Sequence, residues 1–444
     1  MRKSILFLCL VVVGCTNNDQ PKMRVWKGTT PKISVSMMEK EVDPVLGTQK
    51  PDSFLTYLGN KDIDNLDDEM KGLLRTPGDP NQPWEGAAGA AKRAALIPML
   101  KKAEAESSSE SNSEAHVRRI AEAAPAAAHR VSAELLLARC LLEDGDSAAA
   151  TDAAVKGLDW ADKMSFDAKG VPLWKQLHPV RERALKVARA MAMNPKLAQA
   201  DLYRLDEAVK KMNSNRQALA EAIARSFSNT YLVPAYQVAS LRTGVNIFQA
   251  ITGANVDHAV AESFASEVFK DHKSPYDPHE MAKLASSYTM GLIGALDKPW
   301  PVAKTAMKKM YAQSVEAWGF DPFNMTEAQF KDASLRAKTK TKIAGVTGPN
   351  SYLHVQALSR DYIGAIPDAY AFDLQDDAIV AGIQKAVDKA KNGGNSLSTS
   401  SGLVHDPVSG QPFVLSGSTV KSPYTVAPDD PQQIKDACGK SYSI

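Results

Sequence analysis

The sequence has 444 residues, 44% hydrophobic and 7% aromatic, which is enough for two or three domains or one long helical array. Its 53 Lys and Arg nearly balance 51 Asp and Glu, so no basic excess supports nucleic-acid binding. After the first fourteen residues, no apolar stretch approaches the roughly 20 residues that a membrane-spanning helix needs.

The first residues have the pattern of a secretory signal peptide. Met1-Arg2-Lys3 is a short basic start, and Ile5 to Val13 is an apolar run too short to span a bilayer. A buried helix is the alternative, but it would carry polar residues at helical spacing, and only Cys9 interrupts the run. Removal of residues 1–14 would lower the basic count from 53 to 51, equal to the acidic count.

The end of this run, Val12-Val13-Gly14-Cys15, resembles the lipobox of bacterial lipoproteins. The resemblance implies that Cys15 receives a diacylglycerol, that the chain is cut before it, and that the new amine is acylated, for example with palmitate. Burial of acyl chains contributes about 0.8 kcal/mol per CH₂, so several chains would hold the protein on a membrane. Thr16 follows, and by the enterobacterial sorting rule a residue other than Asp favours the outer membrane over the inner one.

The sequence predicts four segments. Residues 1–14 form the signal peptide, and residues 15–82 form a tether followed by a loop-rich stretch with turn formers such as Thr76-Pro77-Gly78. Residues 83–342 form an all-α domain, and residues 343–444 hold two helices and a short extended or hairpin region.

Strong helix formers dominate from about Trp84, and the pattern predicts successive helices. Pro125 is expected to stop one of them, and Thr326 with Gln329 three residues later forms a predicted capping box. The expected ranges are 87–106, 114–124, 131–142, 147–164, 173–193, 197–212, 216–228, 233–251, 257–271, 278–296, 301–318 and 326–340.

The stretch 131–164 predicts two close antiparallel helices. Asp146 or Ser147 is the expected N-cap of the second, and small residues such as Ala150 and Ala154 let the helices approach. The stretch resembles one tetratricopeptide unit through Leu137, Ala138, Gly145-Asp146 and Ala150, but Ala154 and Gly157 depart from that pattern. No second copy occurs at a 34-residue period.

The C-terminal part is predicted to hold helices at 351–362 and 374–391, followed by extended patches at 413–415 and 424–426. Asp406-Pro407 is expected to begin a turn, Gly410 to adopt positive φ, and Phe413 to cover an apolar surface. The segment 406–413, together with Pro428-Asp429, resembles the end of a group of uncharacterised bacterial envelope proteins with a helical body. Asp297-Lys298-Pro299-Trp300-Pro301 is similar to a helix start in the same group.

One cluster of possible metal ligands stands out. Asp271, His272, Asp277, His279 and Glu280 fall within ten residues, and imidazole with carboxylate is a donor set that zinc or another divalent ion accepts. The simpler interpretation is a polar turn between two helices, with Asp277 capping the second.

Two further patterns have weaker chemical interpretations. Ser418 and Lys421 have the Ser-x-x-Lys spacing of serine acyltransferases, but that chemistry needs a helix and Pro423 indicates an extended context. A basic run could contact anionic lipid or glycan phosphate, although a solvated helix face explains it more simply. The run consists of Lys331, Arg336, Lys338, Lys340 and Lys342.

Two cysteines remain after loss of Cys9 and modification of Cys15. Cys140 and Cys438 lie in a compartment that would permit a disulfide, but Cys140 sits on the apolar face of 133–142, where it suits a small core residue.

We therefore expect a mainly α fold of packed antiparallel helical hairpins, able to stack as a solenoid, with a small C-terminal β and loop segment. The leading functional hypothesis is a non-catalytic, lipid-anchored envelope protein without a cofactor, which presents a helical surface to an envelope protein partner. The alternative is a glycan- or ligand-binding lipoprotein of the nutrient-uptake type. Few aromatic residues are present for stacking on sugars, and core packing explains four of them. These four are Trp160, Trp174, Trp300 and Trp318.

Overall fold

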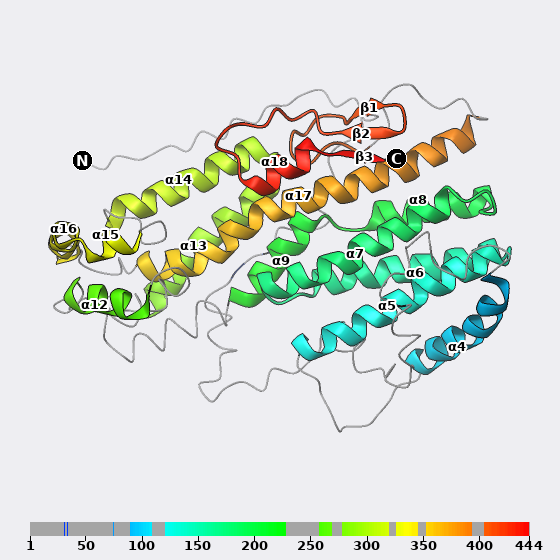
Figure 1. Ribbon diagram of the computed structural model, residues 1–444, viewed down its shortest axis with the longest axis horizontal. Coiled ribbons are helices and arrows are strands. Elements are labelled where there is room, and N and C mark those ends of the chain that lie inside the picture. The colour runs from blue at the N-terminus through cyan, green and yellow to red at the C-terminus, as the bar shows by residue number, and fades with distance from the viewer. Residues whose placement is uncertain are drawn as a thin grey trace, which may run out of the picture.

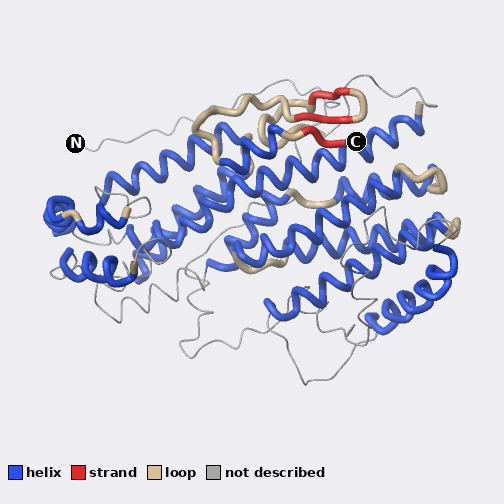
Figure 2. The backbone as a smooth tube through the Cα atoms, in the orientation of Figure 1, coloured by secondary structure: helices blue, strands red, loops and turns tan. Residues whose placement is uncertain are grey.

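The computed structural model describes residues 89–108, 120–227, 257–268, 278–318, 326–344, 352–392 and 404–443, with Pro31, Ile33 and Leu74. Over these residues the chain is mainly helical, and the helices pack against one another around a shared hydrophobic core (Figure 1). The predicted mainly α fold is confirmed. Three short strands near the C-terminus form an antiparallel sheet (Figure 2). No described helix is both long enough and apolar enough to cross a membrane.

The elements have the following bounds. The helices described before residue 345 are α4 (Ala90–Ser108), α5 (Ile120–Glu143), α6 (Ser147–Phe166), α7 (Val171–Ala192), α8 (Gln199–Lys211), α9 (Asn215–Phe227), α12 (His258–Val268), α13 (Pro278–Leu296), α14 (Trp300–Trp318), α15 (Glu327–Lys331) and α16 (Ala333–Ala344). The elements after it are α17 (Tyr352–Lys391), β1 (Val414–Ser416), β2 (Thr419–Lys421), α18 (Gln432–Gly439) and β3 (Ser441–Ser443).

Helices α5 and α6 form a closely packed hairpin, as predicted from the small residues between them. Asp146 caps α6, because its side chain accepts a hydrogen bond from the Ala149 N–H at 3.1 Å. The helices approach closely at Gly157, where an added Cβ would lie 2.8 Å from Cδ2 of Leu135. The side chain of Cys140 is fully buried in this hairpin.

A second hairpin, α7 with α8, stacks beside the first (Figure 1). The polar contacts between the two hairpins join residues that are a nearly constant distance apart in the sequence. Arg183 donates to Ser132, the Ala198 N–H donates to Ser147, and Asn213 donates to Asp162, each across 51 residues. The structure therefore repeats at about 51 residues, which a search at a 34-residue period does not find.

Helix α17 connects the two halves of the molecule. It packs against α7, α8 and α9 on one side and against α13, α14 and α18 on the other (Figure 1). Its buried face runs from Ala365 through Tyr370 and Leu374 to Val387, and it includes three buried carboxylates, Asp373, Asp376 and Asp377. This continuous burial fixes the position of α17 in the core.

The predicted helix stop at Pro125 is wrong, and two predicted helices near the C-terminus are one. Pro125 lies inside α5, where it is exposed. Pro367 lies inside α17, which unites the predicted helices 351–362 and 374–391. On both sides of Pro367 the apolar residues Ile366 and Ala369 are fully buried, and this tertiary packing outweighs the local cost of the proline.

The other boundaries follow the predictions with small shifts. Thr326 and Gln329 form the predicted capping box, but the helix that follows is divided at Asp332 into α15 and α16. The predicted helix 233–251 lies outside the described residues. The predicted extended patch 424–426 forms no strand, and the strand that pairs with β1 is Thr419–Lys421.

The two remaining cysteines are free and buried, Cys140 within α5 and Cys438 within α18. Burial raises the pKa of the Cys140 thiol to about 12 and that of Cys438 to about 11. Both thiols are therefore protonated at neutral pH and chemically unreactive, as expected of core residues.

Candidate functional site

Helices α6 and α8 run in the same direction, and polar contacts join their N-terminal ends and their C-terminal ends. At their N-terminal ends, Ser147 Oγ donates to Asp201 Oδ2 at 2.6 Å and accepts from the Ala198 N–H at 2.9 Å. At their C-terminal ends, the Asp162 carboxylate accepts from the backbone and side-chain nitrogens of Asn213 at 2.9 and 2.8 Å. Both ends are thus held at fixed separations.

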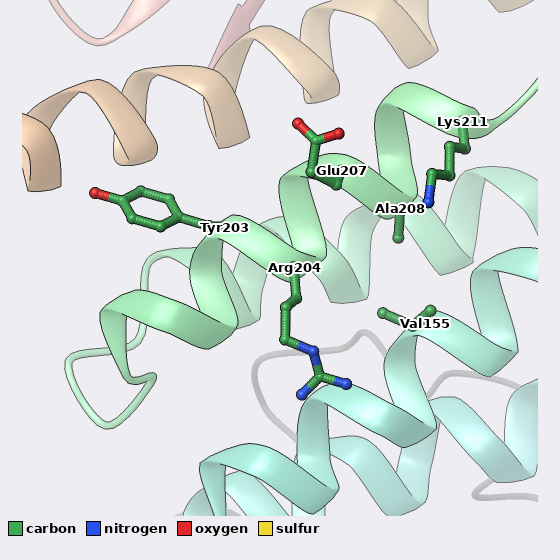
Figure 3. A pocket seen from close by; sticks show the side chains of 6 residues that line it. All are labelled: Val155, Tyr203, Arg204, Glu207, Ala208 and Lys211. Carbon is green, nitrogen blue, oxygen red and sulfur yellow. The ribbon is translucent and has the colours of Figure 1, made fainter.

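A groove of about 400 Å³ lies between these two helices (Figure 3). Its apolar part comes from Val155 of α6 and Ala208 of α8, whose short side chains leave the space open. Arg204 extends toward α6, whereas Tyr203 and Glu207 extend away from it (Figure 3). Lys211 completes the lining at the C-terminal end of α8.

The charges in the groove differ in how they are paired. Arg204 forms ion pairs with Asp152 and Asp201, and the hydrogen bond that it donates to Asp152 raises the pKa of this arginine. Glu207 pairs with Lys210 at 3.2 Å. Lys211 is exposed and has no ion-pair partner among the residues that the structure describes. The groove therefore offers one free ammonium group beside a small apolar surface.

The side chains diverge from α8 instead of converging on one point (Figure 3). In the described part of the chain, no three His, Cys, Asp or Glu side chains lie close enough to hold a metal ion.

Comparison with protein families, with curated proteins and with solved structures finds no match. The function of the groove is therefore argued from geometry alone.

Two buried arginines fasten the helices beneath the groove to α17. Arg181 of α7 is fully buried and donates to Asp162 at 2.6 Å, to Asp376 at 2.9 Å, and to the Asn213 carbonyl. Burial alone would lower the pKa of this arginine, but the two carboxylates raise it above its ordinary value. Arg181 is therefore charged and joins α6, α7 and α17.

Arg216 of α9 makes a second connection to the same face of α17, three residues before Asp376. It pairs with Asp373 at 2.8 Å, and it donates to the carbonyls of Leu296 and Lys298 at 3.0 and 3.2 Å. Its guanidinium carbon lies 4.9 Å from the ring centre of Tyr370. These contacts hold α9, the end of α13 and α17 in one position.

His178 gives the fold a dependence on pH. Its ring stacks on Phe372 with 3.6 Å between ring centres, and burial lowers its pKa below 6.5, although Asp376 and Glu182 raise it and Arg181 lowers it further. Below pH 6.5 the unfolded chain therefore binds a proton at this residue that the folded chain does not bind. The free energy of unfolding should fall as pH decreases from 6.5, by at most about 1.4 kcal/mol per pH unit from this group.

Urea denaturation between pH 5 and 8 measures this effect. His178→Phe keeps a flat ring against Phe372 but removes the proton-binding site, so its unfolding free energy should decline less steeply below pH 6.5 than that of the wild type. Equal slopes for the two proteins would contradict the assignment.

The two motifs that suggested the envelope-protein resemblance meet in the structure. The Trp300 backbone N–H donates to the Val408 carbonyl at 2.9 Å, and Trp300 Nε1 donates to Asp430 at 2.9 Å. Lys304 also binds Asp430, at 2.7 Å, and this bond together with the one from Trp300 keeps the pKa of Asp430 low despite the opposing effect of burial. We name this set of contacts the C-terminal clasp, because it fixes residues 404–443 to the start of α14.

The turn at Asp406 forms as predicted. Asp406 is fully buried and accepts hydrogen bonds from the Val408 N–H at 2.8 Å and from Ser422 at 2.6 Å. Gly410 has φ of 74°, and Phe413 is buried. This turn presents the Val408 carbonyl to Trp300.

Most of the predicted site residues lie outside the described residues. Cys15, Asp271, His272 and Asp277 are all among them, so lipid attachment and metal binding remain predictions. His279 is the second residue of α13 and is half-buried; the side chain of Glu280 is not described.

The Ser-x-x-Lys pair does not form an acyltransferase site. Ser418 lies in the turn after Gly417, and Lys421 ends β2, where it pairs with Val414 and Ser441. Because no helix places the lysine one turn from the serine, the extended context that the sequence indicated is confirmed.

Sequence reasoning missed both the groove and the buried arginines. Three carboxylates interrupt an otherwise apolar helical stretch at Asp373, Asp376 and Asp377, and this signal was available. Buried carboxylates require partners, so the pattern implied buried cations, but it did not say which arginines supply them.

Proposed function

We propose that this protein is a lipid-anchored, non-catalytic component of the bacterial cell envelope, with the outer membrane favoured, and that it presents the groove between α6 and α8 to a protein partner. The N-terminal pattern ending at Cys15 supports the anchor. The groove supports the proposal of binding, because the two helices that form it are joined at both ends and its apolar residues, Val155 and Ala208, are only half-buried.

The rigid attachment of the hairpins supports a scaffold role. Arg181 and Arg216 hold the stacked hairpins against α17 through buried ion pairs, so the groove keeps its shape without a bound partner. An acidic side chain of the partner would pair with Lys211, and a small apolar side chain would cover Val155 and Ala208.

The burial of the tryptophan rings supports glycan binding less well than it supports binding of a protein partner. Trp174 and Trp300 are each 1% exposed and take part in core packing, and Trp160 is half-buried beneath the Lys156 ammonium. Sugars stack on exposed rings, which these positions do not offer.

The lipid anchor is tested by labelling cells with a palmitate analogue. Wild-type protein should carry the label and move with the outer-membrane fraction on a density gradient. Cys15→Ser should lose the label completely, because no other residue is expected to be acylated. A labelled Cys15→Ser protein would overturn the anchor.

The partner surface is tested by a photo-crosslinking residue placed at Lys211 in the groove. The matched control is the same residue at Lys101, which is exposed on α4. Irradiation of cells should give one discrete adduct from position 211 and none from position 101. Adducts from neither position, or the same adducts from both, would contradict the proposed surface.

A further inference from the structure

Helix α16 has an unusual charge for a chain that is nearly neutral. Its twelve residues include four basic residues and no acidic one, whereas the whole chain has 53 basic and 51 acidic residues. The basic residues are Arg336, Lys338, Lys340 and Lys342. Among the described helices, α16 alone carries basic residues without any acidic one.

Helix α16 packs with α12 and α15 at one end of the molecule (Figure 1, left). Phe264 and Phe330 pack edge to face inside this unit, with 5.2 Å between ring centres. Arg336 fastens α16 to it, because its guanidinium donates to the Phe330 carbonyl and to Glu267, each at 2.7 Å. Arg336 therefore orients the helix, whereas Lys338 and Lys340 are exposed on it.

The outward face of α16 is narrow and bordered by lysines. At about 100° per residue, Leu335 and the buried Thr339 mark the inward face. Ala333, Ala337 and Thr341 are exposed on the opposite face. Lys338 and Lys340 are exposed and flank this strip on its two sides, about 200° apart around the helix axis.

This shape suits a flat anionic surface. The residues between the lysines are short, so the helix can approach a plane closely while both ammonium groups reach the same plane. Ala and Thr add little apolar area for insertion, so the contact depends on charge. No aromatic side chain lies on this strip for stacking on the bases of a single-stranded nucleic acid.

We propose that α16 is a contact surface for anionic lipid headgroups. It would hold this end of the body against the membrane to which the lipid anchor attaches it, and in this respect the inference rests on the proposed function. A lipid anchor leaves the orientation of the body free, and a second, electrostatic contact restricts it.

The test measures vesicle binding by full-length Cys15→Ser protein, which lacks the lipid, with and without further substitutions in α16. The quantity measured is the ratio of partition coefficients for vesicles with 30 mol% (about one third) anionic lipid and for wholly zwitterionic vesicles, because contributions from the apolar N-terminus cancel in this ratio. Lys338→Gln with Lys340→Gln should lower the ratio by about 30-fold, since each lysine near such a surface contributes about fivefold.

The matched control is Lys389→Gln with Lys391→Gln. These lysines have the same spacing and are exposed, but they lie at the C-terminal end of α17, at the opposite end of the molecule from α16 (Figure 1). The control pair should leave the ratio nearly unchanged. Raising the salt concentration should weaken wild-type binding and reduce the difference between the variants.

Three outcomes would overturn the inference. The ratio could be unchanged in the α16 variant, or it could fall equally in both variants, which would indicate a general charge effect. Soluble polyphosphate could also bind through Lys338 and Lys340 as tightly as the vesicles do, which would make α16 a site for phosphate polymers. Loss of palmitate labelling at Cys15 is measured separately, so failure of the anchor and failure of this surface are distinguishable.

Discussion

Arg181→Met should destabilise the protein by about 3–5 kcal/mol in urea denaturation. The substitution keeps most of the side-chain volume but removes the charge that satisfies Asp162 and Asp376, and the side chain of Asp376 is only 1% exposed. A buried carboxylate without a partner must either remain charged at high cost or bind a proton. Arg181→Lys should also be destabilising, because one ammonium group cannot reproduce the three contacts of the guanidinium.

Arg204→Met is the matched control. Arg204 also binds two aspartates, but its side chain is 49% exposed and solvent screens both pairs. We expect a loss of less than about 1 kcal/mol for this variant. Equal losses for the two arginines would show that burial is not what makes the Arg181 cluster important.

Trp300→Ala should also cost about 3–5 kcal/mol, because it removes the largest side chain of the C-terminal clasp. Trp300 is 1% exposed, it packs against Tyr370 with 5.4 Å between ring centres, and its indole N–H satisfies Asp430. Loss of the ring should loosen residues 404–443 from α14 before the rest of the fold is lost. Hydrogen exchange should therefore speed up first in α18 and β3.

Trp160→Ala is the control for the loss of an indole ring. Trp160 is half-buried on α6, so its replacement should cost clearly less and leave exchange in α18 and β3 unchanged. If Trp300→Ala accelerated exchange evenly over all helices, the clasp would have no local role.

The sequence alone was sufficient where a few neighbouring residues decide the structure. Asp146 and Thr326 mark helix starts because their side chains satisfy N–H groups within three residues. Gly410 marks its turn because only glycine adopts that backbone conformation without strain. The apolar face of α5, with Cys140 in it, follows from helical spacing. The lipid site at Cys15 also depends only on local sequence, and it remains a prediction.

Only the tertiary structure decided which distant residues meet. Arg181 and Asp376 are 195 residues apart, and Trp300 and Asp430 are 130 residues apart, so no local pattern joins them. Packing also explains Pro367, which lies within α17 because burial of the residues on both sides outweighs the local cost. Helical periodicity tells which face of a segment is buried, but the partner of that face depends on how all the segments pack together.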